Sequence, residues 1–275
     1  MVTKDDLKNI GWKDMLPIYL GGTGRMFLIT ISGIDYLFKP AEKKWTHEKQ
    51  RFRGIVQEVA SKIQKIVDEE SYVPCIYFEN KELAGSLQIK YKIDTNAPHY
   101  QIVQTDDSFD ITREETKQFL REFITDYLLC NFDAHGSNFI TDSNGIIRGV
   151  DKEQCFRYIA TKNDYFNIFI NPNEEYGESE TIYNYLFKRY INGTLDIDFD
   201  ILEKYIEKIE NISDEDYISI FEEYIDARKH RIETSYLRKL ILERKQQVRV
   251  KMNDFVSYLK EERDKMVGKK LWITN

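Results

Sequence analysis

The sequence predicts an α+β protein with two lobes, a small one of strands around one long helix and a larger, mostly helical one. Residues 25–32 and 34–39 are rich in the β-branched and aromatic side chains that strands favour. Residues 46–67 then place apolar side chains at three- and four-residue steps, which is the period of an amphipathic helix. We expect the small lobe to occupy residues 1–93 and the helical lobe to occupy residues 94–275.

Turn and capping signals predict the other elements. Residues 72–78 and 83–93 have the composition of two further strands separated by a polar turn. A helix is expected to begin after Thr112 or Asp110, because either side chain can accept a hydrogen bond from the first free backbone N–H groups. That helix leads to a short hairpin that ends at Asp151, and helical patterns fill most of the remaining sequence.

Composition excludes several classes of protein. With 275 residues, 41% of them apolar and 13% aromatic, the chain has ample material for a core and is not globally disordered. No apolar run reaches the ~20 residues of a membrane-spanning helix, and the N-terminal residues are too polar for a secretory signal. The three cysteines, Cys75, Cys130 and Cys155, are an odd number without CxxC spacing. We therefore expect buried free thiols and a cytoplasmic protein.

Charge is unevenly distributed along the chain. The formal net charge is −7, yet residues 227–275 contain 14 Lys or Arg against 6 Asp or Glu. These basic residues are diluted by acidic ones and spread along predicted helices, which is typical of a solvated helical face. A nucleic-acid-binding protein concentrates Lys and Arg in a patch or stripe. We therefore predict no direct contact with nucleic acid.

Three segments of the small lobe contain candidate phosphate-binding groups. The glycine-rich residues 21–24 directly precede a strand, where they form either a simple turn or a loop whose N–H groups contact phosphate. Lys39 closes an apolar strand, so its ammonium group either reaches solvent or contacts phosphate while a carboxylate holds it. Glu58, on the long helix, is the expected partner of Lys39.

The densest polar cluster follows the helix that begins near Thr112. Asp133 and Asn138 stand five residues apart, a spacing that suits one carboxylate facing a hydroxyl nucleophile and one amide binding a metal ion. The alternative is an Asn- and Asp-rich turn with no chemistry. Asp151, at the end of the apolar hairpin, favours the first interpretation because Mg²⁺ prefers one or two carboxylates together with phosphate oxygens. His135 is expected to organise this loop.

Together these segments resemble the atypical kinase group that contains HipA-like kinases and phosphatidylinositol 3/4-kinases. Residues 36–40 (YLFKP) resemble the strand with the ATP lysine, and residues 57–60 (QEVA) resemble the helix with its ion-pair glutamate. Residues 131–138 (NFDAHGSN) resemble the NxDxHxxN catalytic loop of HipA-like kinases in particular, and residues 149–151 resemble the strand with the metal-binding Asp. The motifs occur in the same order as in that group.

The resemblance implies a two-lobed kinase that uses ATP and Mg²⁺. Asp133, Lys39 and Glu58 would be catalytic, and Asn138 and Asp151 would bind the metal. The implied nucleotide-binding residues are Gly21, Gly22, Thr23, Gly24, Lys39, Gln88, Ile89 and Lys90.

The acceptor and the biological role are less defined by the sequence. The predicted acceptor is a protein Ser or Thr, with a phosphoinositide kinase and a nucleotide-binding pseudokinase as alternatives. A pseudokinase would lack Lys39, Asp133 or Asp151, and all three are present. A toxin paired with an antitoxin-type or other regulatory protein partner is a further interpretation of the role. Thr23 either caps the turn or is a site of autophosphorylation that weakens ATP binding.

Overall fold

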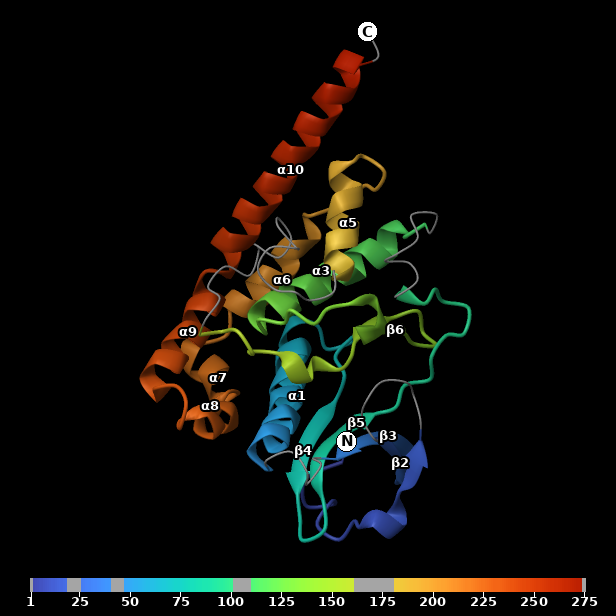
Figure 1. Cartoon of the computed structure of the whole chain (residues 1–275), viewed down its shortest axis with the longest axis vertical. Coiled ribbons are helices and arrows are strands. Elements are labelled where there is room, and N and C mark those ends of the chain that lie inside the picture. Colours follow the sequence, from blue (N-terminus) through green and yellow to red (C-terminus); the bar gives the residue numbers. More distant parts are fainter. Residues whose placement is uncertain (1, 19–25, 41–46, 101–109, 161–180, 274–275) are drawn as a thin grey trace.

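A computed structural model of the chain places an antiparallel sheet at one end of the molecule and helices at the other, with the C-terminal helix extending away from the body (Figure 1). The structure describes residues 2–18, 26–40, 47–100, 110–160 and 181–273, and only the backbone within 47–51 and 268–273. The predicted α+β class is confirmed.

The sheet contains five antiparallel strands in the order β1-β2-β3-β5-β4. Each predicted strand is present, although the last one is shorter than expected. The unpredicted β1 contains only three residues, one of them Pro17, and is too short to show a strand pattern in the sequence. The elements are the 3-10 helix η1 (Trp12–Asp14) and strands β1 (Leu16–Ile18), β2 (Met26–Ile31), β3 (Ile34–Pro40), β4 (Cys75–Glu79) and β5 (Ala84–Ile89).

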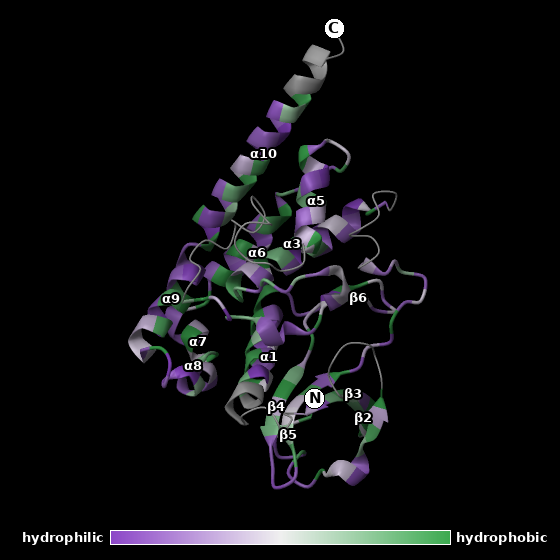
Figure 2. Ribbon diagram, viewed as in Figure 1, coloured by the Kyte–Doolittle hydropathy of each residue, from purple (hydrophilic) through white to green (hydrophobic). Residues whose placement is uncertain are grey.

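Helix α1 (His47–Val67) is the predicted long helix, and it packs against β4 and β5 on one side and against helices of the C-terminal part on others. Its apolar positions, such as Val56 and Ile63, are fully buried. Gly54 allows the close approach to the sheet, since a Cβ at this position would lie 2.5 Å from Cδ2 of the buried Tyr77 ring. Apolar residues recur along α1 and β4, where the two elements meet (Figure 2).

The helical part begins with Thr112 as the N-cap, one of the two residues predicted for that position. Thr112 Oγ1 accepts from Glu115 N at 3.1 Å, and Glu115 Oε2 accepts from Thr112 N at 2.9 Å, so two free N–H groups are satisfied. The helices are α3 (Arg113–Leu128), α5 (Ile182–Ile191), α6 (Ile201–Glu210), α7 (Asp214–Ser219), α8 (Glu222–Arg228), α9 (Thr234–Gln246) and α10 (Val248–Ile273).

Along the chain, the predicted hairpin follows α3 and precedes the C-terminal helices. It consists of β6 (Phe139–Thr141) and β7 (Ile147–Gly149), with the 3-10 helices η2 (Gly136–Asn138) before it and η3 (Lys152–Gln154) after it.

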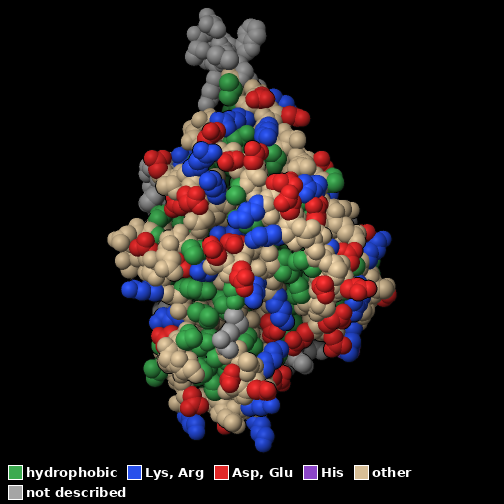
Figure 3. Space-filling model, turned by 180° about the vertical axis from the view of Figure 1, so that it is seen from behind, with side chains coloured by type: hydrophobic (Ala, Val, Ile, Leu, Met, Phe, Trp, Pro, Cys, Tyr) green, Lys and Arg blue, Asp and Glu red, His purple; other side chains and the backbone are tan. Residues whose placement is uncertain are grey.

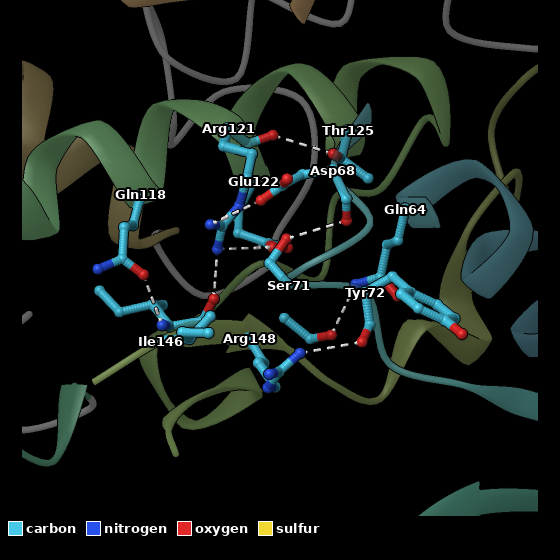
Figure 4. A network of polar contacts seen from close by, with 12 residues as sticks. Gln64, Asp68, Ser71, Tyr72, Gln118, Arg121, Glu122, Thr125, Ile146 and Arg148 are labelled. Atoms are coloured by element: carbon cyan, nitrogen blue, oxygen red, sulfur yellow. Dashed lines mark hydrogen bonds and ion pairs between the residues drawn. The ribbon is translucent and has the colours of Figure 1, made fainter. Parts of the chain in front are cut away.

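Arginines anchor this hairpin to its surroundings. Arg148 donates to the carbonyls of Glu70 and Tyr72 at 2.9 and 3.0 Å (Figure 4). Arg121 of α3 donates to the carbonyl of Ile147 in β7. The hairpin is therefore tied both to α3 and to the connection between α1 and β4.

Two hydrophobic clusters form the core of the described residues. The larger one combines α1 with the helices from α3 to α10, and the smaller one lies between the sheet and the N-terminal residues. Because α1 shares its core with the later helices, the predicted division at residues 93 and 94 stays a prediction. The three cysteines are buried and free, as expected. In the part of the chain that the structure describes, no helix meets the length and apolarity that a bilayer crossing requires.

Basic side chains near the C-terminus pair with carboxylates of α6 and of the connection between α5 and α6. Arg249 lies 2.7 Å from carboxylate oxygens of both Glu203 and Glu210, and Arg263 lies 2.8 Å from Asp196. Acidic and basic side chains are interspersed over the face seen in Figure 3. These pairs fit the expected solvated helical face, and the absence of nucleic-acid contacts stays a prediction.

We predict that Gly54→Ala lowers the free energy of unfolding by about 1–2 kcal/mol, although alanine is ordinarily the better helix former. The added methyl group would press against the Tyr77 ring, and such overpacking of a core costs about 1–3 kcal/mol. Urea denaturation measures the change, with Lys65→Ala at an exposed position of the same helix as the control. A higher free energy of unfolding in Gly54→Ala would contradict this prediction, because it would show that α1 and β4 can move apart without a loss of stability.

Candidate active site

Lys39 lies at the end of β3 and faces two carboxylates. Its Nζ is 2.9 Å from Asp151 Oδ1 and 2.8 Å from Glu153 Oε2, and its side chain is 26% exposed. Burial by itself would lower the pKa of Lys39, but the charges of Asp151 and Glu153 outweigh it, so the pKa is raised. Lys39 is therefore a fixed cation at neutral pH, as a phosphate-binding lysine must be.

The backbone at Asp151 explains why both carboxylates reach Lys39. Asp151 is the N-cap of η3 with φ +54°, a left-handed conformation that costs a non-glycine residue about 1 kcal/mol. The chain turns there so that Asp151 and Glu153 both contact Lys39. The side chain of Lys152 between them points to the interior, where its Nζ lies 2.6 Å from Asp126 Oδ1.

The predicted catalytic loop is joined to the short segment that leads from β7 to Asp151. Asn138 Nδ2 donates to the Asp133 carbonyl at 2.7 Å, and Asn138 O accepts from Val150 N at 2.8 Å. The first of these bonds orients the amide and leaves its Oδ1 as the atom that can bind a cation. The structure thus brings Asp133, Asn138 and Asp151 together with Lys39.

His135 organises the loop, as predicted. Its Nε2 lies 3.3 Å from Asp133 Oδ1, and its Nδ1 lies 2.6 Å from Ser137 Oγ. The hydrogen bond to Asp133 raises the pKa of His135 against the opposing effect of burial, and the charges of Asp133 and Asp151 raise it further. His135 therefore joins two positions of the loop, Asp133 and Ser137.

Asp126, near the end of α3, holds both loops of the site. It is fully buried and accepts hydrogen bonds from Asn131 Nδ2 at 2.9 Å, from Lys152 Nζ at 2.6 Å and from Tyr183 Oη at 2.7 Å. Asn131 Oδ1 in turn accepts from Asp133 N at 3.1 Å. One carboxylate therefore fixes the predicted catalytic loop on one side and the segment with Asp151 on the other.

The sequence did not identify Asp126 or Glu153 as site residues. Asp126 is hidden because it lies within the amphipathic pattern of α3, where an isolated acidic residue is common. Glu153 could have been found from the Asp-Lys-Glu sequence at 151–153, because alternating charges after a buried strand suggest side chains that point in opposite directions.

Glu58 does not meet Lys39, which corrects the predicted ion pair. Glu58 Oε2 accepts from Tyr77 N at 2.9 Å, and its two oxygens lie 2.8 Å from Lys62 Nζ and 3.2 Å from Lys4 Nζ. Burial raises and these partners lower the pKa of Glu58, with a net lowering. Glu58 therefore fastens α1 to β4 instead of orienting Lys39.

The structure describes some of the predicted nucleotide-binding residues and not others. Gln88 lines a small cavity together with Gln57, Cys75 and Asp151. Ile89 N donates to Pro74 O at 3.1 Å and Lys90 N donates to Asp35 O at 2.9 Å, so both N–H groups have partners within the fold. Their contact with nucleotide stays a prediction. The glycine-rich residues Gly21, Gly22, Thr23 and Gly24 lie outside the described residues.

Asn138 and Asp151, the two predicted metal-binding residues, can hold Mg²⁺ only together with oxygen atoms of a bound nucleotide or water. Among the residues that the structure describes, no three His, Cys, Asp or Glu side chains form a group that could hold a metal ion. Asn138 Oδ1 and the partly exposed Asp151 carboxylate supply two hard oxygen ligands. Mg²⁺ usually completes such a set with water and phosphate oxygens, so the residues fit a metal that arrives with a nucleotide.

Among solved structures, the chain is similar in fold to the crystal structure of a Helicobacter pylori proinflammatory kinase called CtkA. The two chains have 16% sequence identity and a TM-score of 0.54, and the match covers 87% of this chain and 94% of CtkA. No protein-family model and no protein of curated function matches the sequence. The comparison therefore establishes a kinase-like fold, and the finer resemblance to HipA-like kinases stays a prediction.

We predict that Asp126→Asn lowers the free energy of unfolding by about 3 kcal/mol, because it leaves Lys152 buried without its main counter-charge. Urea denaturation measures this loss. The control is Asp196→Asn, which removes an exposed ion pair with Arg263 and should cost less than about 1 kcal/mol. Equal losses in the two variants would contradict the central role of Asp126.

We predict that the stability difference between the wild type and His135→Gln is largest at acidic pH. A raised pKa means that the protonated imidazole stabilises the folded state. This contribution is complete below the unfolded pKa, about 6.5, and is lost as pH rises through the folded pKa. Denaturation at pH 5.5 and 9 tests it, and the difference should be less than about 1 kcal/mol for a partly exposed pair. In an Asp133→Asn background the dependence on pH should weaken, and a dependence of opposite sign would exclude the His135–Asp133 pair.

Proposed function

We propose that this protein is an ATP- and Mg²⁺-dependent kinase that transfers the γ-phosphoryl group to a hydroxyl. The observation that carries the proposal is the meeting of Lys39 from the sheet with Asp151, Asn138 and Asp133 from the hairpin and its preceding loop. Lys39 and Asp151 are 112 residues apart in sequence. A cation, two candidate metal ligands and a partly exposed carboxylate in one place are the parts that phosphoryl transfer requires.

Each residue has a separate task in this proposal. Lys39 binds the α- and β-phosphates, and Asn138 and Asp151 bind the metal, which neutralises charge on the phosphate oxygens. Asp133 orients the acceptor hydroxyl and accepts its proton, because its carboxylate is one-third exposed and is not used by Asn138, which bonds its carbonyl. His135, held by Asp133, limits the orientations of that carboxylate. Positioning and charge neutralisation supply most of the catalysis.

The proposed acceptor is a Ser or Thr hydroxyl of a protein. Support comes from the NxDxHxxN pattern at residues 131–138 and from the fold similarity to CtkA, which is described as a kinase. The resemblance of residues 131–138 to HipA-like kinases also supports an antitoxin-type or other regulatory protein partner. The three buried free cysteines support the proposed cytoplasmic location.

The proposal is tested by incubating the protein with radiolabelled ATP and MgCl₂ against panels of proteins, phosphoinositide vesicles and small hydroxyl compounds. Label on protein Ser or Thr that disappears with EDTA is the expected result. Asp151→Asn is the matched inactive variant, because it keeps the size of the side chain and removes the metal-binding charge. Label on lipid alone would replace the proposed acceptor, and nucleotide binding without transfer to any acceptor would indicate a pseudokinase.

We predict that Asp133→Asn reduces transfer by at least about 100-fold while the dissociation constant for ATP changes less than about threefold. The reason is that Asp133 acts on the acceptor, whereas Lys39 and the metal ligands bind the nucleotide. Nucleotide titration and initial rates on the same preparation measure the two effects. A large loss of ATP affinity would move Asp133 into the metal site and leave the base unassigned.

A further inference from the structure

Lys39 has two acidic partners, and they differ in how firmly they are held. The Asp151 side chain is 44% exposed, whereas that of Glu153 is only 13% exposed. Glu153 Oε1 also accepts from Arg53 Nη1 at 3.0 Å, while its Oε2 lies 2.8 Å from Lys39 Nζ. In the proposed kinase, Asp151 has to turn to the metal. Glu153 has no such second task and keeps its position through Arg53.

One face of α1 runs along the segment that contains these carboxylates. Gln64 donates to Gly149 O at 2.8 Å, Gln57 approaches Asp151 Oδ1 at 3.4 Å and Arg53 donates to Glu153. Arg53, Gln57 and Gln64 are spaced by four and seven residues and therefore lie on one face of the helix. Residues nearer the N-terminus of α1 therefore contact residues later in the segment, from Gly149 through Asp151 to Glu153.

Glu58 cannot take part in this alignment. It follows Gln57 directly, and one residue along a helix turns the side chain by about 100°. Its carboxylate is directed to the backbone of β4, where it accepts from Tyr77 N. A Glu at position 58 could meet Lys39 only if α1 rotated about its axis, and that rotation would break the bonds of Gln64 and Arg53.

We infer that Glu153, held by Arg53, is the positioning residue that orients Lys39 toward the phosphates of a nucleotide, in the place of a carboxylate on the long helix. The helix acts through its arginine: Arg53 orients Glu153, and Glu153 orients Lys39. This inference rests on the proposed function for the nucleotide, but the Arg53–Glu153–Lys39 chain of contacts is independent of it.

The first experiment tests the pairing without any nucleotide. Free energies of unfolding are measured for Lys39→Met, Glu153→Gln and the double variant, and in parallel for Lys39→Met with Glu58→Gln. We expect the first pair to be non-additive, with the double variant losing less than the sum, and the second pair to be additive. Additivity in the first cycle with coupling in the second would overturn the inference. If Glu153→Gln does not fold, Arg53→Met with Lys39→Met replaces the first cycle and has the same expected coupling.

The second experiment tests positioning through nucleotide affinity. We expect Glu153→Gln to weaken ATP binding at least about tenfold, which is the effect of one charge-assisted hydrogen bond, and Glu58→Gln to change it less than about twofold. Titration with a fluorescent ATP analogue, with and without Mg²⁺, measures the dissociation constants. Because a loss of folding would reduce the fraction of active sites without changing that constant, this readout separates positioning from stability.

The outcomes distinguish the inference from the proposed function. Unchanged affinity in Glu153→Gln, together with a loss in Lys39→Met, would overturn the positioning role and leave the kinase proposal intact. A wild-type protein that binds no nucleotide would instead overturn the proposed function, and the unfolding cycles would still decide whether Glu153 is the partner of Lys39.

Discussion

The buried ion pair between Asp126 and Lys152 is the interaction on which the arrangement of the site depends. Neither side chain has appreciable contact with solvent, so each charge needs the other to offset its lost hydration. Burial by itself would lower the pKa of Lys152, but the charge of Asp126, aided by Glu122, raises it. Because Asp126 also accepts from Asn131 and Tyr183, it is a fixed point to which α3, the loop of residues 131–138 and the segment after β7 are all joined.

The inward direction of Lys152 determines where its neighbours point. Side chains on either side of an inward residue turn outward, and the left-handed backbone at Asp151 completes the turn that brings Asp151 and Glu153 to Lys39. This arrangement requires a glycine at position 149, since a Cβ there would lie 2.6 Å from Lys152 Nζ. Lys152 inside the core and Lys39 in the candidate site are thus coupled through three consecutive residues, Asp151 to Glu153.

Helix α1 packs against the sheet on one side and contacts this segment with its polar face. Its buried apolar residues belong to the core that the C-terminal helices form, while Gly54 and Glu58 fasten it to β4 through Tyr77. Its polar face contacts the chain from Gly149 onward. A shift of α1 would therefore disturb its contacts with β4 and with the segment after β7 together.

Sequence patterns alone were enough to predict strands β2 to β5, α1, the hairpin and a helix cap at Thr112 or Asp110, and they selected Lys39, Asp133, Asn138 and Asp151. These are local properties, since periodicity, capping and the spacing of residues within one loop depend on near neighbours in the chain. Only the tertiary structure decided which carboxylate meets Lys39, because the choice between Glu58 and Glu153 depends on the rotation of a helix that was correctly placed. Likewise, no local pattern separates Asp126 from an ordinary polar residue of α3, since its importance arises from contacts with residues up to 57 positions away.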